Sequence, residues 1–104
     1  YLLNCFREYV ESNILEALTI DDIARYLGCS KSKLYRELKD VTDYSPVDLV
    51  NLVRLHKAVN LMRYEHQNIS EASFNTGFSS PSYFSRTFLK YYHMRPKEYI
   101  QSKS

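Results

Sequence analysis

Two arginines stand at matching places in two similar stretches of this 104-residue sequence. Arg36 and Arg86 each follow an apolar residue by two positions, Leu34 in the first stretch and Phe84 in the second. The planar guanidinium group can donate two parallel hydrogen bonds, a geometry that matches a guanine edge or a phosphate group. A single surface arginine is usually only a solvated charge, but its repetition within a repeated pattern indicates contact with nucleic acid.

The sequence contains no group of residues with the spacing of a catalytic motif. His56, His66 and His93 are scattered and form neither an HExxH motif nor an i, i+4 pair. Asp21 and Asp22 are adjacent carboxylates, but they stand at a predicted helix start, where capping explains acidic residues. The two glycines form no phosphate-binding loop. The sequence therefore predicts a protein that is not an enzyme and that has no cofactor and no metal site.

The residues before the second arginine predict two short helices joined by a tight turn. Asn68 and Glu71 have the spacing of a capping box, in which each side chain bonds the backbone of the other at a helix start. Gly77 can take the left-handed conformation that ends this helix. Ser80 followed by Pro81 is typical of the next helix start. This order of elements predicts a helix-turn-helix.

The residues around the first arginine repeat this pattern, at a shift of 49 positions before the turn and 50 after it. Gly28 corresponds to Gly77 in the turn, and Pro46 corresponds to Pro96 beyond the second helix. The other matching pairs are Ile20 with Ile69, Asp22 with Glu71, Leu34 with Phe84, Leu38 with Phe88, and Asp43 with His93. Repetition of a whole supersecondary unit is rarely accidental, so we expect two helix-turn-helix motifs.

Further helices are predicted from the spacing of apolar residues. Residues 2–15 have apolar side chains at three- and four-residue steps, as in an amphipathic helix. Ser45 and Pro46 open a long helix to about Tyr64, which is apolar on two sides and so needs two packing partners. The simplest source of partners is one helix-turn-helix at each end. A short helix at Lys97–Gln101 completes an all-α chain of about seven helices.

Two helix-turn-helix motifs joined by one long helix resemble the DNA-binding domain of the AraC/XylS family of transcription regulators. The resemblance covers nearly all of the chain and is carried by LTIDDIARYLGCSKSKLYREL, SPVDLVNLVRLHKAVNLM and NISEASFNTGFSSPSYFSRTFLKYYHMRPKEY. A lone helix-turn-helix pattern would be weak evidence, whereas two motifs with this linker are specific. The resemblance implies homeodomain-like helix-turn-helix subdomains at residues 1–44 and 66–104, with residues 45–65 as the linker helix.

The sequence departs from the family pattern at four positions. The family usually has glycine where Asp43 and His93 follow the two recognition helices. Asp and His tolerate a left-handed backbone better than most residues, so we expect both turns to survive at a small cost. Ala72 and Ser73 replace a large aliphatic residue and an alanine, and Ser73 can keep the close helix crossing if its hydroxyl bonds back to its own helix. The side chains expected to refill this core are Tyr91, Tyr92, Met94 and Tyr99.

The outward side chains of the two predicted recognition helices are the candidate DNA contacts. On the first helix, about Lys31–Lys39, they are Lys31, Ser32, Tyr35, Arg36 and Lys39; on the second they are Pro81, Ser82, Ser85, Arg86 and Lys90. The arginines are expected to contact guanine or phosphate, and the lysines phosphate. Tyr35 and Ser32 would contact bases or sugars, unless the tyrosine only covers neighbouring apolar stems. Ser82 has the alternative role of belonging only to the helix start.

The distribution of charge supports this interpretation better than the net charge of +2 does. Residues 1–27 hold two basic and five acidic residues, whereas residues 28–104 hold twelve basic and seven acidic residues and contain both recognition helices. This asymmetry fits a DNA-facing side, with an uneven scatter of surface charge as the alternative. A helix-turn-helix module that binds only protein is the competing function, against which the basic outer faces argue.

The resemblance also implies partners outside this chain. The predicted function is sequence-specific binding of a double-stranded promoter site by the output domain of a bacterial regulator, with both recognition helices in successive major grooves. The chain starts without Met in a helical pattern, so we expect a piece of a longer protein that carries an N-terminal sensor, dimerisation or receiver domain. RNA polymerase is the other expected partner. We expect a cytoplasmic location, reduced Cys5 and Cys29, and no membrane contact by this segment.

Overall fold

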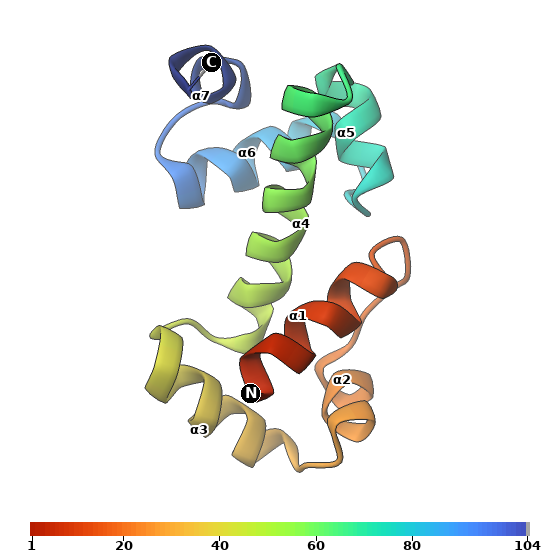
Figure 1. Ribbon diagram of the computed structural model, residues 1–104, viewed down its shortest axis with the longest axis vertical. Coiled ribbons are helices and arrows are strands. Elements are labelled where there is room, and N and C mark those ends of the chain that lie inside the picture. The colour runs from red at the N-terminus through yellow and green to blue at the C-terminus, as the bar shows by residue number, and fades with distance from the viewer. Residues whose placement is uncertain (104) are drawn as a thin grey trace. The chain divides into compact units, whose positions relative to one another are not determined.

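The computed structural model describes residues 1–103, and within that range the chain forms seven α-helices and no β-strand. The helices are α1 (Leu2–Ser12), α2 (Ile20–Leu27), α3 (Lys31–Thr42), α4 (Pro46–Tyr64), α5 (Ile69–Asn75), α6 (Pro81–Tyr92) and α7 (Pro96–Lys103) (Figure 1). The predicted all-α class is confirmed. None of these helices is long and apolar enough to cross a membrane. The chain divides into two compact units, Tyr1–Val53 and a second that begins at Arg54, so the division falls inside α4.

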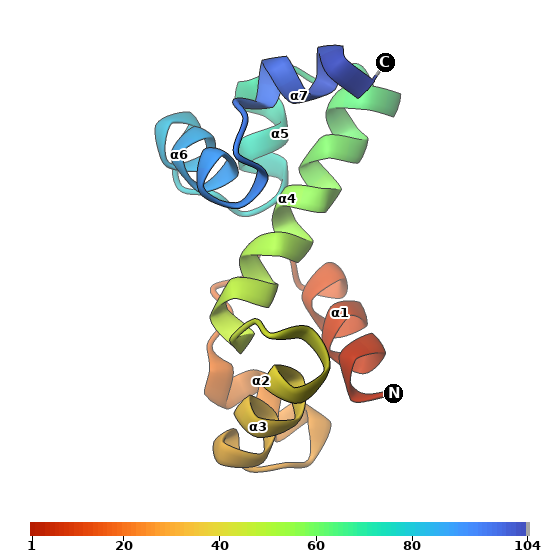
Figure 2. The ribbon, with the colours of Figure 1, turned by 90° about the vertical axis from the view of Figure 1, so that its left-hand side faces the viewer.

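The first unit is built on a core to which each of its helices contributes. Figures 1 and 2 show α1, α2 and α3 gathered around the first turns of α4. The buried apolar side chains are Phe6 and Val10 of α1, Ile23 and Ala24 of α2, Leu34 and Leu38 of α3, and Leu49 and Val50 of α4. Because the two core residues of α3 are four positions apart, they define one buried face of that helix.

The core of the second unit is rich in aromatic rings. Its buried apolar side chains are Leu55, Ala58, Val59, Ala72, Phe78, Phe84 and Phe88. The ring of Phe88 stacks on Tyr92 at a centroid distance of 4.3 Å and meets Tyr99 edge-on at 5.7 Å. Tyr91 also packs against this core, as expected, whereas Met94 does not and Ile100 packs there instead. Met94 lies in the loop between α6 and α7, outside both helices.

The long helix α4 serves both cores. Leu49 and Val50 in its first turns are buried in the first core, whereas Leu55 and Val59 are buried in the second. The prediction that this helix needs two packing partners is therefore confirmed. The two sets of partners contact different parts of its length, in line with the expectation of one helix-turn-helix at each end.

Side-chain caps define several helix starts. Asn68 and Glu71 form the complete predicted capping box: the Asn68 Oδ1 accepts from the Glu71 backbone N–H at 2.8 Å, and the Glu71 Oε1 accepts from the Asn68 N–H at 2.9 Å. At the start of α2, Thr19 and Asp22 have the same spacing but form only half of such a box. The Thr19 Oγ1 accepts from the Asp22 N–H at 3.1 Å, while the Asp22 carboxylate pairs with Arg25 at 3.2 Å.

Three helix ends differ from the sequence prediction: those of α1 and α3, and that of α7, which ends at Lys103 and not at Gln101. The first helix ends at Ser12, three residues before the predicted end, where the Asn13 amide donates to the Tyr9 carbonyl at 2.9 Å. The helix α3 extends three residues beyond its predicted end to Thr42, whose hydroxyl donates to the Leu38 carbonyl at 2.7 Å.

Left-handed residues close the turns as predicted. Gly28 and Gly77 have φ values of +73° and +89°, and Asp43 and His93 have φ values of +64° and +60° after the two recognition helices. The expected bond of Ser73 is also present, since its hydroxyl donates to the Ser70 carbonyl at 2.9 Å while the residue is fully buried. The Ser73 hydroxyl, although buried on α5, therefore has a hydrogen-bond partner.

Replacing Asp43 by glycine should stabilise the protein. An L-residue with a left-handed backbone is strained by about 1–2 kcal/mol, less for aspartate, and glycine removes this strain. Removal of the carboxylate also ends an unfavourable charge at the C-terminus of α3. We expect the free energy of unfolding of Asp43→Gly to rise by about 0.5–1 kcal/mol in a denaturant titration.

Gly28→Ala is the matched control for this effect. A Cβ atom at Gly28 would meet no other atom within 4 Å, so the substitution tests the left-handed backbone alone. We expect it to lower the free energy of unfolding by about 1 kcal/mol. A loss of stability in Asp43→Gly would show that the aspartate side chain contributes more than its backbone strain costs.

Candidate nucleic-acid interface

The rotation of α3 is set by a cap and by two buried leucines. The Ser30 Oγ accepts from the Lys33 backbone N–H at 3.2 Å and starts the helix. Leu34 and Leu38 are fully buried, so the opposite side of the helix is turned toward solvent. This arrangement determines which side chains of the helix are available to a ligand.

The five predicted contact residues on α3 lie together on its exposed side. Lys31, Ser32, Tyr35, Arg36 and Lys39 are all exposed, and they line one shallow hollow of about 580 Å³. The tyrosine ring keeps 42% of its surface exposed although three long cationic side chains are its neighbours. The hollow therefore combines cationic groups, a hydroxyl and an aromatic face, which suits a nucleic-acid surface of phosphates and base edges.

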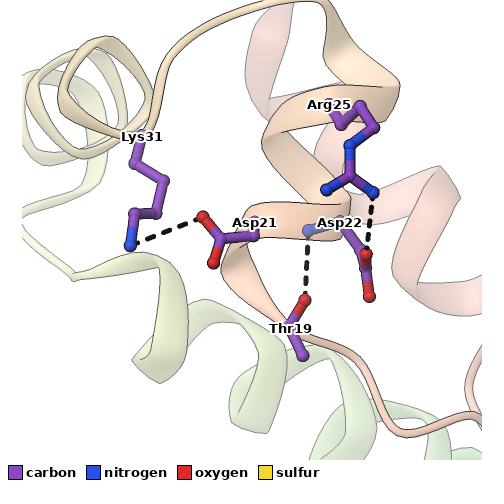
Figure 3. Close-up of polar contacts among 5 residues, drawn as sticks. All are labelled: Thr19, Asp21, Asp22, Arg25 and Lys31. Carbon is purple, nitrogen blue, oxygen red and sulfur yellow. Dashed lines mark hydrogen bonds and ion pairs between the residues drawn. The ribbon is translucent and has the colours of Figure 1, made fainter.

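The lysines of α3 differ in how they are held. The Nζ of Lys31 lies 3.4 Å from the Oδ1 of Asp21 at the start of α2, across the turn (Figure 3). The Nζ of Lys33 lies 3.9 Å from the Oε1 of Glu37, one turn along its own helix. Within the described residues, Arg36 has no hydrogen bond or ion pair, so its guanidinium group is available. Sequence reasoning missed the contact of Asp21, because the two charged residues are ten positions apart on different helices.

The second recognition helix, α6, has the same construction. The Ser80 Oγ accepts from the Tyr83 N–H at 3.1 Å, and Phe84 and Phe88 are fully buried. Of the predicted contact residues on this helix, Ser82, Arg86 and Lys90 are exposed, whereas Pro81 and Ser85 are half-buried. The Lys90 Nζ lies 5.3 Å from the centre of the Tyr91 ring. The exposed side of α6 therefore offers fewer long polar groups than that of α3.

The arginines of α4 belong to the packed part of the second unit. Burial lowers the pKa of Arg54, an effect opposed in part by the charge of the nearby Tyr83 hydroxyl. The guanidinium group of Arg63 lies over the Tyr99 ring at 5.8 Å, with its Nε and Nη2 atoms buried. Both arginines therefore contribute to packing within the second unit. Arg63 forms no ion pair within residues 1–103.

Comparison with known proteins places these features in a family. A family model described as a helix-turn-helix domain matches residues 23–102. Histidine kinase P4 of Formosa agariphila is 33% identical over 91 residues, which cover 86% of this chain and 7% of that protein. The transcriptional activator RhaS of Escherichia coli O139:H28 is 27% identical over 101 residues, which cover 97% of this chain and 36% of that protein. The chain thus spans about a third of the length of RhaS and a much smaller part of the kinase.

Solved structures show the same relationship. A transcriptional regulator from Chromobacterium violaceum, described as containing an AraC-type DNA-binding domain, is 30% identical with a TM-score of 0.87, over 99% of this chain and 92% of that one. Apo ToxT K231A from Vibrio cholerae is 26% identical with a TM-score of 0.87, over 96% of this chain and 36% of that one. RhaS and the Chromobacterium violaceum protein are transcription regulators, and this chain matches the helix-turn-helix part of such proteins. Because the family model covers more than half of the chain, the chain belongs to the AraC-type helix-turn-helix family.

Proposed function

We propose that this chain binds double-stranded DNA sequence-specifically, as the output domain of a bacterial transcription regulator. The observation that carries the proposal is the exposed side of α3, where five polar and cationic side chains line one hollow opposite two buried leucines. Phosphate contacts would position the domain, and contacts to base edges would select the sequence. A promoter site is the proposed target, and the cytoplasm is the proposed location.

On α3, Arg36 is the proposed reader of a guanine edge. Its guanidinium group is exposed and unengaged within the described residues, and arginine bound to guanine O6 and N7 is the most common specific contact in the major groove. Tyr35, one position earlier, offers a ring face and a hydroxyl to a neighbouring base or sugar. Lys39, two turns after Lys31 on the same side, is proposed to contact phosphate.

The second motif is proposed to act mainly through the DNA backbone and DNA shape. Proline at position 81 has no donor, and the hydroxyls of Ser82 and Ser85 can either donate or accept, so their base readout is degenerate. Arg86 is the only long side chain among the exposed polar residues at the centre of this surface, and it is the one proposed base reader there. The cationic Lys90 would contact phosphate.

The two motifs are proposed to enter successive major grooves on one side of the duplex, about 34 Å apart. The proposed subdomain boundaries are residues 1–44 and 66–104 for the motifs and 45–65 for the linker helix. An N-terminal sensor, dimerisation or receiver domain and RNA polymerase remain proposed partners. The names of the relatives include an activator and a dual regulator, so they support transcription regulation without giving its sign for this chain.

Protein binding alone is the second candidate function. The cationic side chains on the exposed sides of α3 and α6 argue against it, because protein-only docking does not require them. An electrophoretic mobility shift with a duplex of random sequence at low salt separates the two functions. A shift that is lost steeply as the salt concentration rises supports DNA binding, since each neutralised phosphate releases counterions.

The spacing of the two half-sites should control specific binding. A duplex site recovered by selection from randomised sequences would be lengthened by about half a helical turn between the half-sites. The insertion moves the second half-site to the opposite side of the duplex, so we expect specific binding to fall to the level of random DNA. The same number of base pairs added outside the two half-sites is the control for length. An unchanged affinity after the half-turn insertion would refute the proposal that both motifs are seated at once.

Arg36→Ala should weaken binding by about 1–3 kcal/mol and relax the preference at one base pair, as expected for a lost bidentate contact. Arg86→Ala should also weaken binding, with a more even loss across sequences if its contact is to phosphate. Arg7→Ala, which removes an exposed arginine from α1, is the matched control. The measurement is a randomised-site selection with each variant. Sequence information concentrated under the second motif and flat under the first would reverse the proposed roles.

A further inference from the structure

An ion pair links the starts of the two helices of the first motif. The Lys31 Nζ at the first position of α3 lies 3.4 Å from the Asp21 Oδ1 in the first turn of α2. Figure 3 shows this carboxylate directed toward the lysine, whereas the next residue, Asp22, is engaged with Thr19 and Arg25. The two adjacent acids therefore have different partners, and only Asp21 reaches the candidate DNA surface.

Helix stability does not explain this pair. The side chains of Lys31 and Asp21 are 56% and 64% exposed, and ion pairs with such exposure contribute little to folding. A cation in the first turn of a helix is also unfavourable, because that end carries the positive pole of the helix dipole.

The second motif offers an internal comparison. At the shifts that relate the two copies, Ser70 corresponds to Asp21 and Pro81 corresponds to Lys31. The capping acid is kept, since Glu71 corresponds to Asp22 and caps its helix. The second motif therefore lacks both charges at the positions that correspond to this ion pair. Its helices α5 and α6 still form, with side-chain caps and buried faces. The pair is not required by the helix-turn-helix architecture.

We propose that Asp21 sets the DNA affinity of the first motif by competing with phosphate for Lys31. This inference rests on the proposed DNA-binding function. A lysine at the edge of the hollow would neutralise a phosphate of any duplex, whatever its sequence. Because Lys31 is paired with Asp21 in the free protein, it can contact a phosphate only after this ion pair is broken. On a selected site, the base contacts of α3 place Lys31 beside a phosphate, and the ion pair is broken as part of that binding.

Asp21→Asn should therefore strengthen binding to a duplex of random sequence. Release of one lysine adds about one phosphate contact, which raises the affinity by up to about 5-fold, the most that an exposed ion pair can withhold, and steepens the slope of log K against log salt by about 0.9. On a selected site the unmodified chain already makes this contact and breaks the pair to do so, so Asp21→Asn should raise the affinity there as well, with an unchanged salt slope. Fluorescence anisotropy over a salt series with the full chain measures both quantities.

Asp22→Asn is the matched control, because it makes the same change of charge one residue away without releasing Lys31. In a Lys31→Gln background, Asp21→Asn should have little effect on affinity or on the salt slope. Thermal unfolding of each variant verifies that it is folded. An equal gain in Asp21→Asn and Asp22→Asn, or an Asp21→Asn effect that persists without Lys31, would overturn the inference. Failure of the unmodified chain to bind any duplex at low salt would instead refute the proposed function.

Discussion

The burial of two apolar side chains four residues apart determines what each recognition helix can present. Leu34 and Leu38 on α3 and Phe84 and Phe88 on α6 are fully buried. Exposing one such pair would cost about 3–6 kcal/mol, at about 1.5–3 kcal/mol for each side chain. The exposed ion pair of Lys31 with Asp21 belongs to a class worth about 0–1 kcal/mol. Apolar burial, and not charge pairing, therefore fixes the side of α3 that carries its cationic residues.

Each unit has a filled apolar core, but the two cores are built from different kinds of side chain. Aliphatic residues of four helices, with Phe6, fill the first core. In the second core, Ala72 leaves space on α5, and linked aromatic rings occupy the interior from Phe78 through Phe84 and Phe88 to Tyr99. Burial raises the pKa of Tyr92 in this group, as expected for a phenol moved from water into a mostly apolar environment. The small residues of α5 are thus compatible with a well-filled core.

Local signals predicted much of this structure, and long-range contacts account for most of what was missed. Asn68 with Glu71, and Gly28, act within a few residues of the chain, so their spacing alone indicated the cap and the turn. The ends of α1 and α3 carry bonds from the side chains of Asn13 and Thr42 to carbonyls one turn earlier, for which the apolar pattern contains no information. Helix boundaries are for this reason less predictable than the existence of the helices.

The sequence predicted which side of α3 is exposed, but it did not predict the ion pair that forms there. The positions of Leu34 and Leu38 indicate that Ser32, Tyr35 and Arg36 face outward, and these residues lie exposed. The partner of Lys31 could not be obtained in this way, because it depends on how α2 and α3 meet across the turn. Opposite charges on either side of a helix-turn-helix turn are the signal that would have suggested it.

The two copies of the motif have similar buried residues and different exposed residues. Their buried positions pair apolar with apolar, as Leu34 with Phe84, and their turns both use glycine. Their exposed positions pair Lys31 with Pro81, Tyr35 with Ser85 and Lys39 with Leu89, and Leu89 is 45% exposed. Since the buried positions already suffice to form each motif, the outer positions are free to differ without loss of fold. The resulting surfaces have unequal charge and reach, which is the physical basis for assigning them unequal shares of DNA recognition.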